Sequence, residues 1–242
     1  MTRRVLVTRP QPGAEATATR LAAMGFDPVV LPLTRIVPLA PSLAAGVPGC
    51  DAVVVTSANA LRHAPADLVA AHRSLPLFAV GEATADAARR AGFSDVRFAA
   101  GTARDLTALL ADTLPQGTSV LYLAGEVRTA GFEQALVQAG LALQVVETYD
   151  AEEVSYLTDL VKSALGTAPL WGATVFSERA GILLAELAAR PDLRERFESV
   201  RFFCISAKAA APLNGRGQGR VHVSSEPGHD GVLALVSSQA EP

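Results

Sequence analysis

The sequence predicts an α/β protein of two similar parallel-sheet lobes, each with about five strands and with helices on both faces, joined by two extended connections. Three features of the chain support this prediction. Short Val-rich and Leu-rich runs alternate with Ala-rich helical stretches along all 242 residues. The runs are apolar at successive positions, as expected of strands that are covered on both faces of a sheet. The same order of segments then occurs twice, which indicates an internal duplication.

The first half of the chain contains the first copy of this order. Its expected strands are, in sequence, RVLVT, PVVLPL, DAVVVT, PLFAV and VRFAA. A helix is expected after DAVVVT, and three others are expected at residues 14–24, 82–91 and 103–111. Gly25 and Gly92 follow two of these helices, at the position where a C-terminal cap needs a left-handed residue.

The second half repeats the first at an offset that drifts only from 115 residues, between Val5 and Val120, to 125 residues, between Val96 and Val221. Between these ends, VVVTSANA matches ATVFSERA and FAVGEATADAA matches FCISAKAAAPL. Gly140 is the counterpart of Gly25 and is expected to cap a helix in the same way. Segments 32–42 and 147–155 follow the second strand of each copy, and both are candidate connections between lobes.

Composition and charge exclude several classes of protein. The formal net charge is −3 and no cluster of Lys and Arg is longer than a pair, which argues against a nucleic-acid partner. The N-terminal segment MTRRVLVTRPQP lacks the apolar run of a signal peptide, and no segment approaches the ~18 apolar residues of a membrane span. We therefore expect a soluble, cytoplasmic protein without a membrane partner, and a monomer, since no exposed apolar stripe is evident.

The common catalytic and cofactor motifs are absent from the sequence. It has no G-x-G-x-x-G after the first strand, no Walker A lysine, no G-x-S-x-G elbow and no pair of histidines at helical spacing. Cys50 and Cys204 are far apart, lack metal-ligand spacing and are expected to be inert, mostly buried thiols. We expect no metal, no nucleotide and no other cofactor.

The candidate site lies beyond the carboxyl ends of the strands, where an open parallel sheet binds its ligands. The residues there are hydroxyl-bearing side chains, glycines and single arginines. They include Arg9, Thr56, Ser57, Asn59, Gly81, Thr84, Gly125, Arg128 and Ser177. Backbone amides, hydroxyls and guanidinium groups suit carboxylates or phosphates. An alternative stays open, because Thr56, Ser57 and Ser177 are also good helix N-caps that need no ligand, and the arginines could be solvated surface charges.

Tyr149 is one of only three tyrosines, and it lies in the second expected connection. A phenol there could donate a proton or a hydrogen bond to a bound molecule. Packing of an amphipathic side chain on the connection is an equally good explanation from sequence alone.

Together, these motifs resemble the uroporphyrinogen-III synthase family along nearly the whole chain. The resemblance rests on the order and spacing of VLVTRP, LAAMGFDPVVLPLTRI, VVVTSANAL, LFAVGEATADAARRAGF, VLYLAGEVR, LVQAGL, VVETYDAE, VFSERA and EPGHDGVLAL. It implies two α/β lobes with the substrate in a cleft between them. It also implies that the lobes do not coincide with the repeats: residues 1–36 and 150–242 would form one lobe, and residues 37–149 the other.

The resemblance further implies an enzyme that needs no cofactor. The family closes the linear tetrapyrrole hydroxymethylbilane into uroporphyrinogen III, with loss of water and inversion of ring D through a spiro intermediate. Tyr149 matches the tyrosine proposed there as the general acid. Thr56, Ser57, Gly81, Thr84, Gly125 and Ser177 match positions that face the substrate acid groups, and Arg9, Asn59 and Arg128 are plausible additions. The alternative from another class is a non-enzymatic two-lobe binding or regulatory protein for a small anionic metabolite, which would share the fold.

Overall fold

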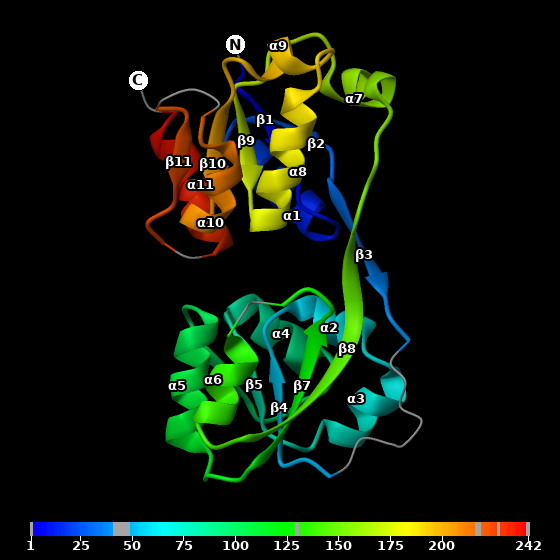
Figure 1. The fold of residues 1–242 in the computed structure, drawn as a ribbon, viewed down its shortest axis with the longest axis vertical. Helices are drawn as coiled ribbons and strands as arrows, with labels where there is room; N and C mark the ends of the chain where they lie inside the picture. Colours follow the sequence, from blue (N-terminus) through cyan, green and yellow to red (C-terminus); the bar gives the residue numbers. More distant parts are fainter. Residues whose placement is uncertain (1, 41–48, 129–130, 216–218, 227, 241–242) are drawn as a thin grey trace. The chain divides into compact units, whose positions relative to one another are not determined.

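The structure is a computed structural model of the chain, and it describes residues 2–40, 49–128, 131–215, 219–226 and 228–240. Residues 41–42, at the end of the first expected connection, lie outside the described residues. The chain forms two compact units (Figure 1), one made of Met1–Arg35 with Glu152–Pro242 and the other of Ile36–Ala151. It passes from one unit to the other twice, within β3 (Thr34–Pro38) and within β8 (Ala142–Glu153).

The discontinuous unit contains a five-stranded sheet of order β11-β10-β9-β1-β2 whose neighbouring strands are parallel. Its strands are β1 (Arg4–Val7), β2 (Asp27–Val30), β9 (Gly172–Val175), β10 (Arg201–Cys204) and β11 (Val221–Val223). Its helices are α1 (Gly13–Ala23), α7 (Thr158–Leu165), α8 (Glu178–Ala189), α9 (Arg194–Phe197), α10 (Ala207–Ala210), the 3₁₀ helix η1 (Ala211–Leu213) and α11 (His229–Ser238).

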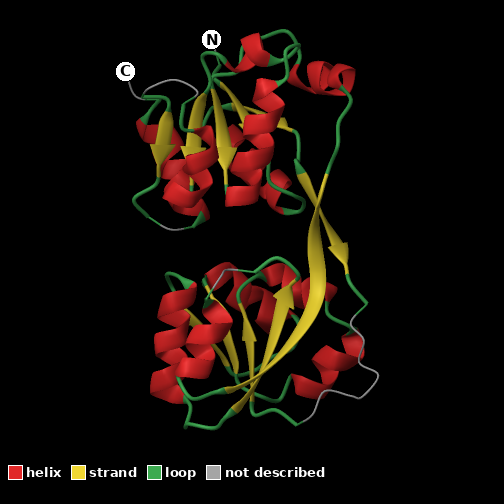
Figure 2. Ribbon diagram, in the orientation of Figure 1, coloured by secondary structure: helices red, strands yellow, loops and turns green. Residues whose placement is uncertain are grey.

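Successive residues of each strand in this sheet pack into two different cores, because successive side chains of a strand point to opposite faces. Leu6 and Phe202 pack with helices α7 to α10 on one face. Val5, Val7 and Phe203 pack with α1 and α11 on the other. Helices therefore cover both faces of the sheet (Figure 2), which explains why its strands are apolar at successive positions.

The continuous unit contains a six-stranded sheet of order β3-β8-β7-β4-β5-β6. Its strands besides β3 and β8 are β4 (Ala52–Val55), β5 (Leu77–Val80), β6 (Val96–Ala99) and β7 (Ser119–Gly125). Its helices are α2 (Ala58–His63), α3 (Ala66–His72), α4 (Glu82–Arg90), α5 (Ala103–Thr113) and α6 (Phe132–Gln138). Val53 and Val55 pack with α2, α3 and α4, whereas Ala52 and Val54 pack with α5 and α6. The predicted α/β class with two largely parallel sheets is confirmed.

The two sequence repeats are distributed over both sheets. Strand β1 of the first repeat pairs with β9 of the second, and β7 of the second pairs with β4 of the first. Each sheet thus combines the first two strands of one repeat with the last three of the other, and β3 adds a sixth strand to the sheet of the continuous unit. Gly25, Gly92 and Gly140 have φ of 86°, 97° and 83° after α1, α4 and α6, which confirms the predicted helix caps.

The two cysteines are free. Cys204 is buried and Cys50 is half-buried, and burial raises the pKa of the Cys204 thiol to about 12. Among the described residues, no group of three or more His, Cys, Asp or Glu side chains could hold a metal ion. No helix in the described ranges is long and apolar enough to cross a membrane.

His229, at the start of α11, links the stability of its unit to pH. Its Nε2 lies 3.0 Å from Thr17 Oγ1 and its Nδ1 lies 3.3 Å from Arg20 Nη1. Burial, and then the charges of Arg9 and Arg20, lower its pKa to about 4, while Asp230 opposes the shift. The folded state therefore keeps a neutral imidazole between about pH 6.5 and 4, where an unfolded histidine is protonated.

We expect the free energy of unfolding to fall as the pH is lowered through this window, because the unfolded chain binds the extra proton. The loss specific to His229 should be about 1–2 kcal/mol once solvent screening of a half-buried group is allowed for. Urea unfolding of the wild type and of His229→Gln at about pH 7 and about pH 4.5 measures it. The wild type should lose more stability than the variant; equal losses would contradict the lowered pKa.

Candidate active site

A cavity of about 250 Å³ lies at the carboxyl edge of the six-stranded sheet, within the continuous unit. It is lined by Thr56, Ser57, Val80, Ala103, Tyr122, Gly125, Val127, Arg128 and Tyr149. Most of these residues lie at or just beyond the ends of β4, β5 and β7 or at the start of α5, whereas Tyr122 is in the middle of β7 and Tyr149 is within β8. Parallel strands end at the same edge of a sheet, so residues far apart in sequence meet there.

Thr56 and Ser57 follow the fully buried strand β4 and have different partners. Ser57 is extended, with φ −148° and ψ 139°, and its Oγ accepts a hydrogen bond from the Asn59 amide at 3.2 Å, which caps α2. Thr56 Oγ1 instead lies 2.9 Å from the Tyr122 hydroxyl. The capping alternative therefore applies to Ser57, while Thr56 belongs to a side-chain pair inside the cavity wall.

Tyr149 lies on β8, where it pairs in register with Gly125 of β7. A Cβ atom on Gly125 would lie 2.7 Å from Tyr149 Cζ and 3.0 Å from its hydroxyl, so the phenol end of the ring rests directly on the glycine. The neighbouring Thr148 is buried and donates to the Ala60 carbonyl at 2.9 Å, which fastens β8 to α2. The strand ends thus hold the phenol at the cavity.

Arg128 is held by three groups at the cavity wall. Its guanidinium donates to the Gly125 carbonyl at 3.1 Å and forms ion pairs with Glu133 and Glu147. The hydrogen bond to Glu147 is the main cause that raises the pKa of Arg128. Its side chain is 25% exposed, so this cation is both neutralised by carboxylates and open to solvent.

Tyr122 is not among the site residues predicted from the sequence, where it stands within the motif VLYLAGEVR. The residue is 2% exposed, and its ring meets Phe132 edge-to-face at 5.3 Å between centroids. Burial raises the pKa of its hydroxyl. The available signal was the residue type itself, because a buried tyrosine needs a partner for its hydroxyl.

Three predicted residues of the same unit do not line the cavity. The Asn59 side-chain oxygen accepts a hydrogen bond from Arg62 at 3.0 Å. Gly81 precedes α4 with φ of 74°, and a Cβ there would meet nothing within 4 Å. Thr84 is 7% exposed inside α4, so its side chain is enclosed by protein.

The other two predicted residues, Arg9 and Ser177, lie in the discontinuous unit. Arg9 follows β1, and its guanidinium lies 4.4 Å from the centroid of the Phe176 ring. Ser177 follows β9 and caps α8 by accepting from the Ala180 amide at 3.1 Å. Both are therefore at the carboxyl edge of the five-stranded sheet, as their positions after strands predicted.

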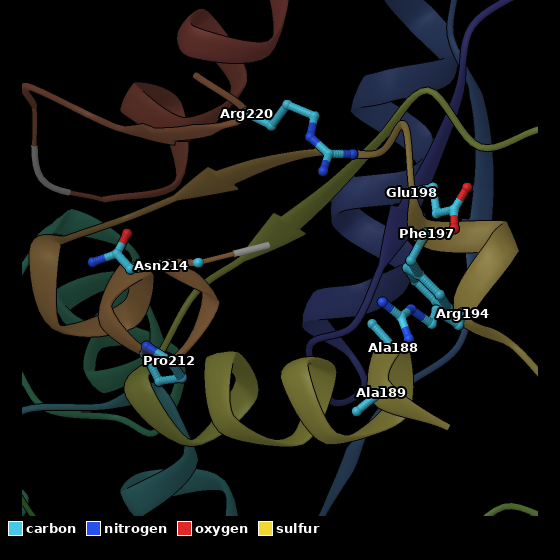
Figure 3. A pocket seen from close by; sticks show the side chains of 9 residues that line it. Ala188, Ala189, Arg194, Phe197, Glu198, Pro212, Asn214 and Arg220 are labelled. Carbon is cyan, nitrogen blue, oxygen red and sulfur yellow. The ribbon is translucent and has the colours of Figure 1, made fainter. Parts of the chain in front are cut away.

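A larger cavity, of about 650 Å³, lies in the discontinuous unit beside α8, α9 and η1 (Figure 3). Its polar wall includes Arg194, Glu198 and Arg220, and the last two precede β10 and β11. The cavity is thus at the amino edge of the sheet, opposite the strand ends that bind ligands in such folds. We assign it no role in the chemistry.

The fold and the smaller cavity define a class of protein. It is a two-unit α/β protein that presents a phenol, hydroxyls and a guanidinium at parallel strand ends, an arrangement suited to an anionic ligand. A family model described as uroporphyrinogen-III synthase HemD matches residues 15–234. The chain belongs to the uroporphyrinogen-III synthase family, and it is accordingly a cyclising hydro-lyase of tetrapyrrole biosynthesis.

Solved structures agree with this family at the level of the fold. The uroporphyrinogen-III synthetase of Helicobacter pylori matches with a TM-score of 0.63 at 18% identity, over 99% of this chain and 100% of that one. A mutant uroporphyrinogen III synthase of Thermus thermophilus matches with a TM-score of 0.57 at 20% identity, over 99% and 100% of the two chains. The comparison with curated proteins finds no match.

Proposed function

We propose that this chain closes hydroxymethylbilane into uroporphyrinogen III at the cavity of the six-stranded sheet, with Tyr149 as the general acid. The observation that carries the proposal is that Tyr149, held on Gly125, shares one cavity with Thr56, Ser57 and Arg128. A proton donor and a set of groups that bind carboxylates are thus within one small space. Membership of the family supports the reaction.

The proposed first step needs a proton at the substrate hydroxyl. The Tyr149 phenol donates it as the carbon–oxygen bond breaks, so water leaves and an electrophilic, cationic azafulvenium remains beside the phenolate. The substituted carbon of the terminal ring then attacks to give the spiro intermediate, which fragments and closes again as the type III isomer. The proton released when the ring finally closes returns to the phenolate. Because the bilane also cyclises unaided to the wrong isomer, holding its two ends in one conformation is the second task of the protein.

The size of the cavity limits what it can hold. A site for a whole drug-sized ligand has about 300–1,000 Å³, and a tetrapyrrole with eight carboxylates is larger than that ligand. The cavity of about 250 Å³ therefore accommodates one end of the substrate. We assign it the reacting end, because the phenol is there.

Arg128 can serve a substrate carboxylate only in competition with Glu133 and Glu147. Ion pairs as open to solvent as these contribute about 0–1 kcal/mol each. A hydrogen bond from a guanidinium to a desolvated substrate acid is worth about 1.5–3 kcal/mol. The exchange therefore favours the substrate, and the two glutamates limit how tightly it is held.

Further features of this function are also proposals. Arg9, Asn59, Gly81, Thr84 and Ser177 are proposed as further contacts to substrate acid groups, with Thr84 the weakest because its side chain is buried. We also propose lobes of residues 1–36 with 150–242 and of residues 37–149, and a monomer that works in the cytoplasm with hydroxymethylbilane as its partner and no cofactor. The near-balanced charge and the absence of long basic runs argue against a nucleic-acid partner.

The function is tested by incubating the protein with freshly made hydroxymethylbilane and separating the type I and type III products. A catalytic amount of protein should give an excess of type III over the unaided reaction. Products identical to those formed without protein would contradict the proposal. They would favour the alternative of a binding protein for a small anionic metabolite.

Ser57 allows capping to be separated from substrate binding. Ser57→Ala removes both and should lower stability by roughly 1 kcal/mol while raising KM. Ser57→Asp keeps an N-cap but places a negative charge beside the substrate acids, so it should retain stability and raise KM further. Melting curves and steady-state kinetics of both variants measure this. Normal KM in Ser57→Asp would leave capping as the only role of Ser57.

A further inference from the structure

The cavity wall contains two hydroxyl groups that lie close together. The family resemblance gave a role to one of them, on Thr56, and none to the other, on Tyr122. Tyr122 OH and Thr56 Oγ1 lie 2.9 Å apart. Both residues line the cavity that also contains Tyr149. Tyr122 is the one polar side chain in the run Val120–Ala124 of β7, and the residues on either side of it are buried and apolar.

The sheet register explains why these two side chains meet. Tyr122 lies opposite Val54 of β4, and Thr56 follows Val54 by two residues. Residues two apart on a strand point to the same face, and diagonal neighbours on adjacent strands are within reach of an aromatic side chain. The Phe132 ring contacts the Tyr122 ring edge-to-face, and this contact helps to fix the orientation of the Tyr122 side chain.

The direction of the hydrogen bond follows from what each hydroxyl can do. A phenol and an alcohol each have one proton to donate. If Tyr122 donates to Thr56 Oγ1, the Thr56 proton stays available for an acceptor in the cavity. A carboxylate is such an acceptor, and it has no proton of its own to give. The opposite direction would direct the Thr56 proton away from an anionic ligand.

We propose that Tyr122 is a positioning residue for substrate binding: its phenol donates to Thr56 Oγ1 and fixes the Thr56 hydroxyl so that it donates to a carboxylate of the tetrapyrrole. The inference rests on the proposed function and goes beyond it by naming a residue that acts on substrate binding through Thr56. Burial raises the pKa of the Tyr122 hydroxyl, so the phenol remains a donor at neutral pH. The bond is part-buried, and its Tyr122 partner is 2% exposed, so water competes less for the phenol than it would at an open surface.

The test is Tyr122→Phe, which removes one oxygen and keeps the ring. KM for hydroxymethylbilane should rise about 5- to 30-fold, and kcat should stay within about twofold, because the chemistry at Tyr149 is unchanged. Tyr156→Phe is the matched control: its hydroxyl donates to the Pro32 carbonyl at 2.9 Å in the other unit. That variant loses the same atom and should keep the wild-type KM.

A double-mutant cycle with Thr56→Val separates positioning from a structural effect. If Tyr122 acts through Thr56, then Tyr122→Phe should change KM no further once Thr56 is valine. Two effects that multiply, or a lowered melting temperature with wild-type KM in Tyr122→Phe, would overturn the inference. A wild-type protein that forms no excess of type III product would instead overturn the proposed function, and the inference with it.

Discussion

Replacing Tyr149 by phenylalanine is expected to lower kcat for type III product by about 10²- to 10⁴-fold, the range typical of a positioned general acid. The ring would still rest on Gly125, since the substitution removes only the hydroxyl at the end of the ring. Nothing else in the cavity would move, so substrate binding should change little. The reaction would then depend on water for the proton that the leaving hydroxyl needs.

The measurement is the initial rate of type III formation with freshly made hydroxymethylbilane, together with the ratio of the two isomers. The ratio matters because the unaided reaction continues in the background and yields the wrong isomer. Tyr156→Phe is again a suitable control, since its phenol is in the other unit and bonds to a backbone carbonyl. Full turnover with an unchanged isomer ratio in Tyr149→Phe would remove Tyr149 from the chemistry.

The competing account of Tyr149 is packing. Its ring lies against the core formed with α2, α3 and α4, and the His63 ring is 6.3 Å away between centroids. Phenylalanine preserves these apolar contacts almost completely. A residue that served packing alone would therefore tolerate the change, so the same variant distinguishes the two accounts.

The alternation of apolar runs and helical stretches was enough to predict most elements of the fold. Strand β4 is buried at every residue, as its uninterrupted valines indicate. This pattern does not predict which of the two sheets each strand joins. Strand β1 pairs with β9, while its counterpart β7 pairs with β4, and all four strands have the same apolar character. Burial is satisfied by either pairing, so composition cannot choose between them.

Site residues could be predicted where their position in the chain places them in the site. They could not be predicted where their role depends on contacts between side chains. Strand ends converge in any parallel sheet, which is why Thr56 and Gly125 were expected together. Tyr149 was expected from its place in the second connection and from the family resemblance. The pairing of Arg128 with two glutamates depends on the course of the chain after β7. Tyr122 was not predicted because its ring is apolar and its partner Thr56 is on another strand, two residues beyond the position that pairs with Tyr122.

Gly125→Ala should show how closely the reaction depends on the place of the phenol. The added Cβ would lie 2.7 Å from Tyr149 Cζ, which is well inside contact distance, so the ring must move. The displaced atoms are the outer end of a half-buried side chain, and we expect a stability cost of no more than about 1 kcal/mol. A shift of about 1 Å in a catalytic group can cost about 10²-fold in rate, so kcat should fall by about that factor.

Steady-state kinetics and a melting curve of Gly125→Ala test this, with Gly49→Ala as the control, because a Cβ at Gly49 would enter open space in the same unit. If the methyl group acts by displacing the phenol, adding Tyr149→Phe to Gly125→Ala should lower kcat far less than it does in the wild type. Independent, multiplying effects would mean that the glycine acts on something other than Tyr149. A proton donor must reach one particular substrate oxygen, so it cannot be displaced without loss of rate. Wild-type kcat in Gly125→Ala would therefore contradict the role of Tyr149 as that donor.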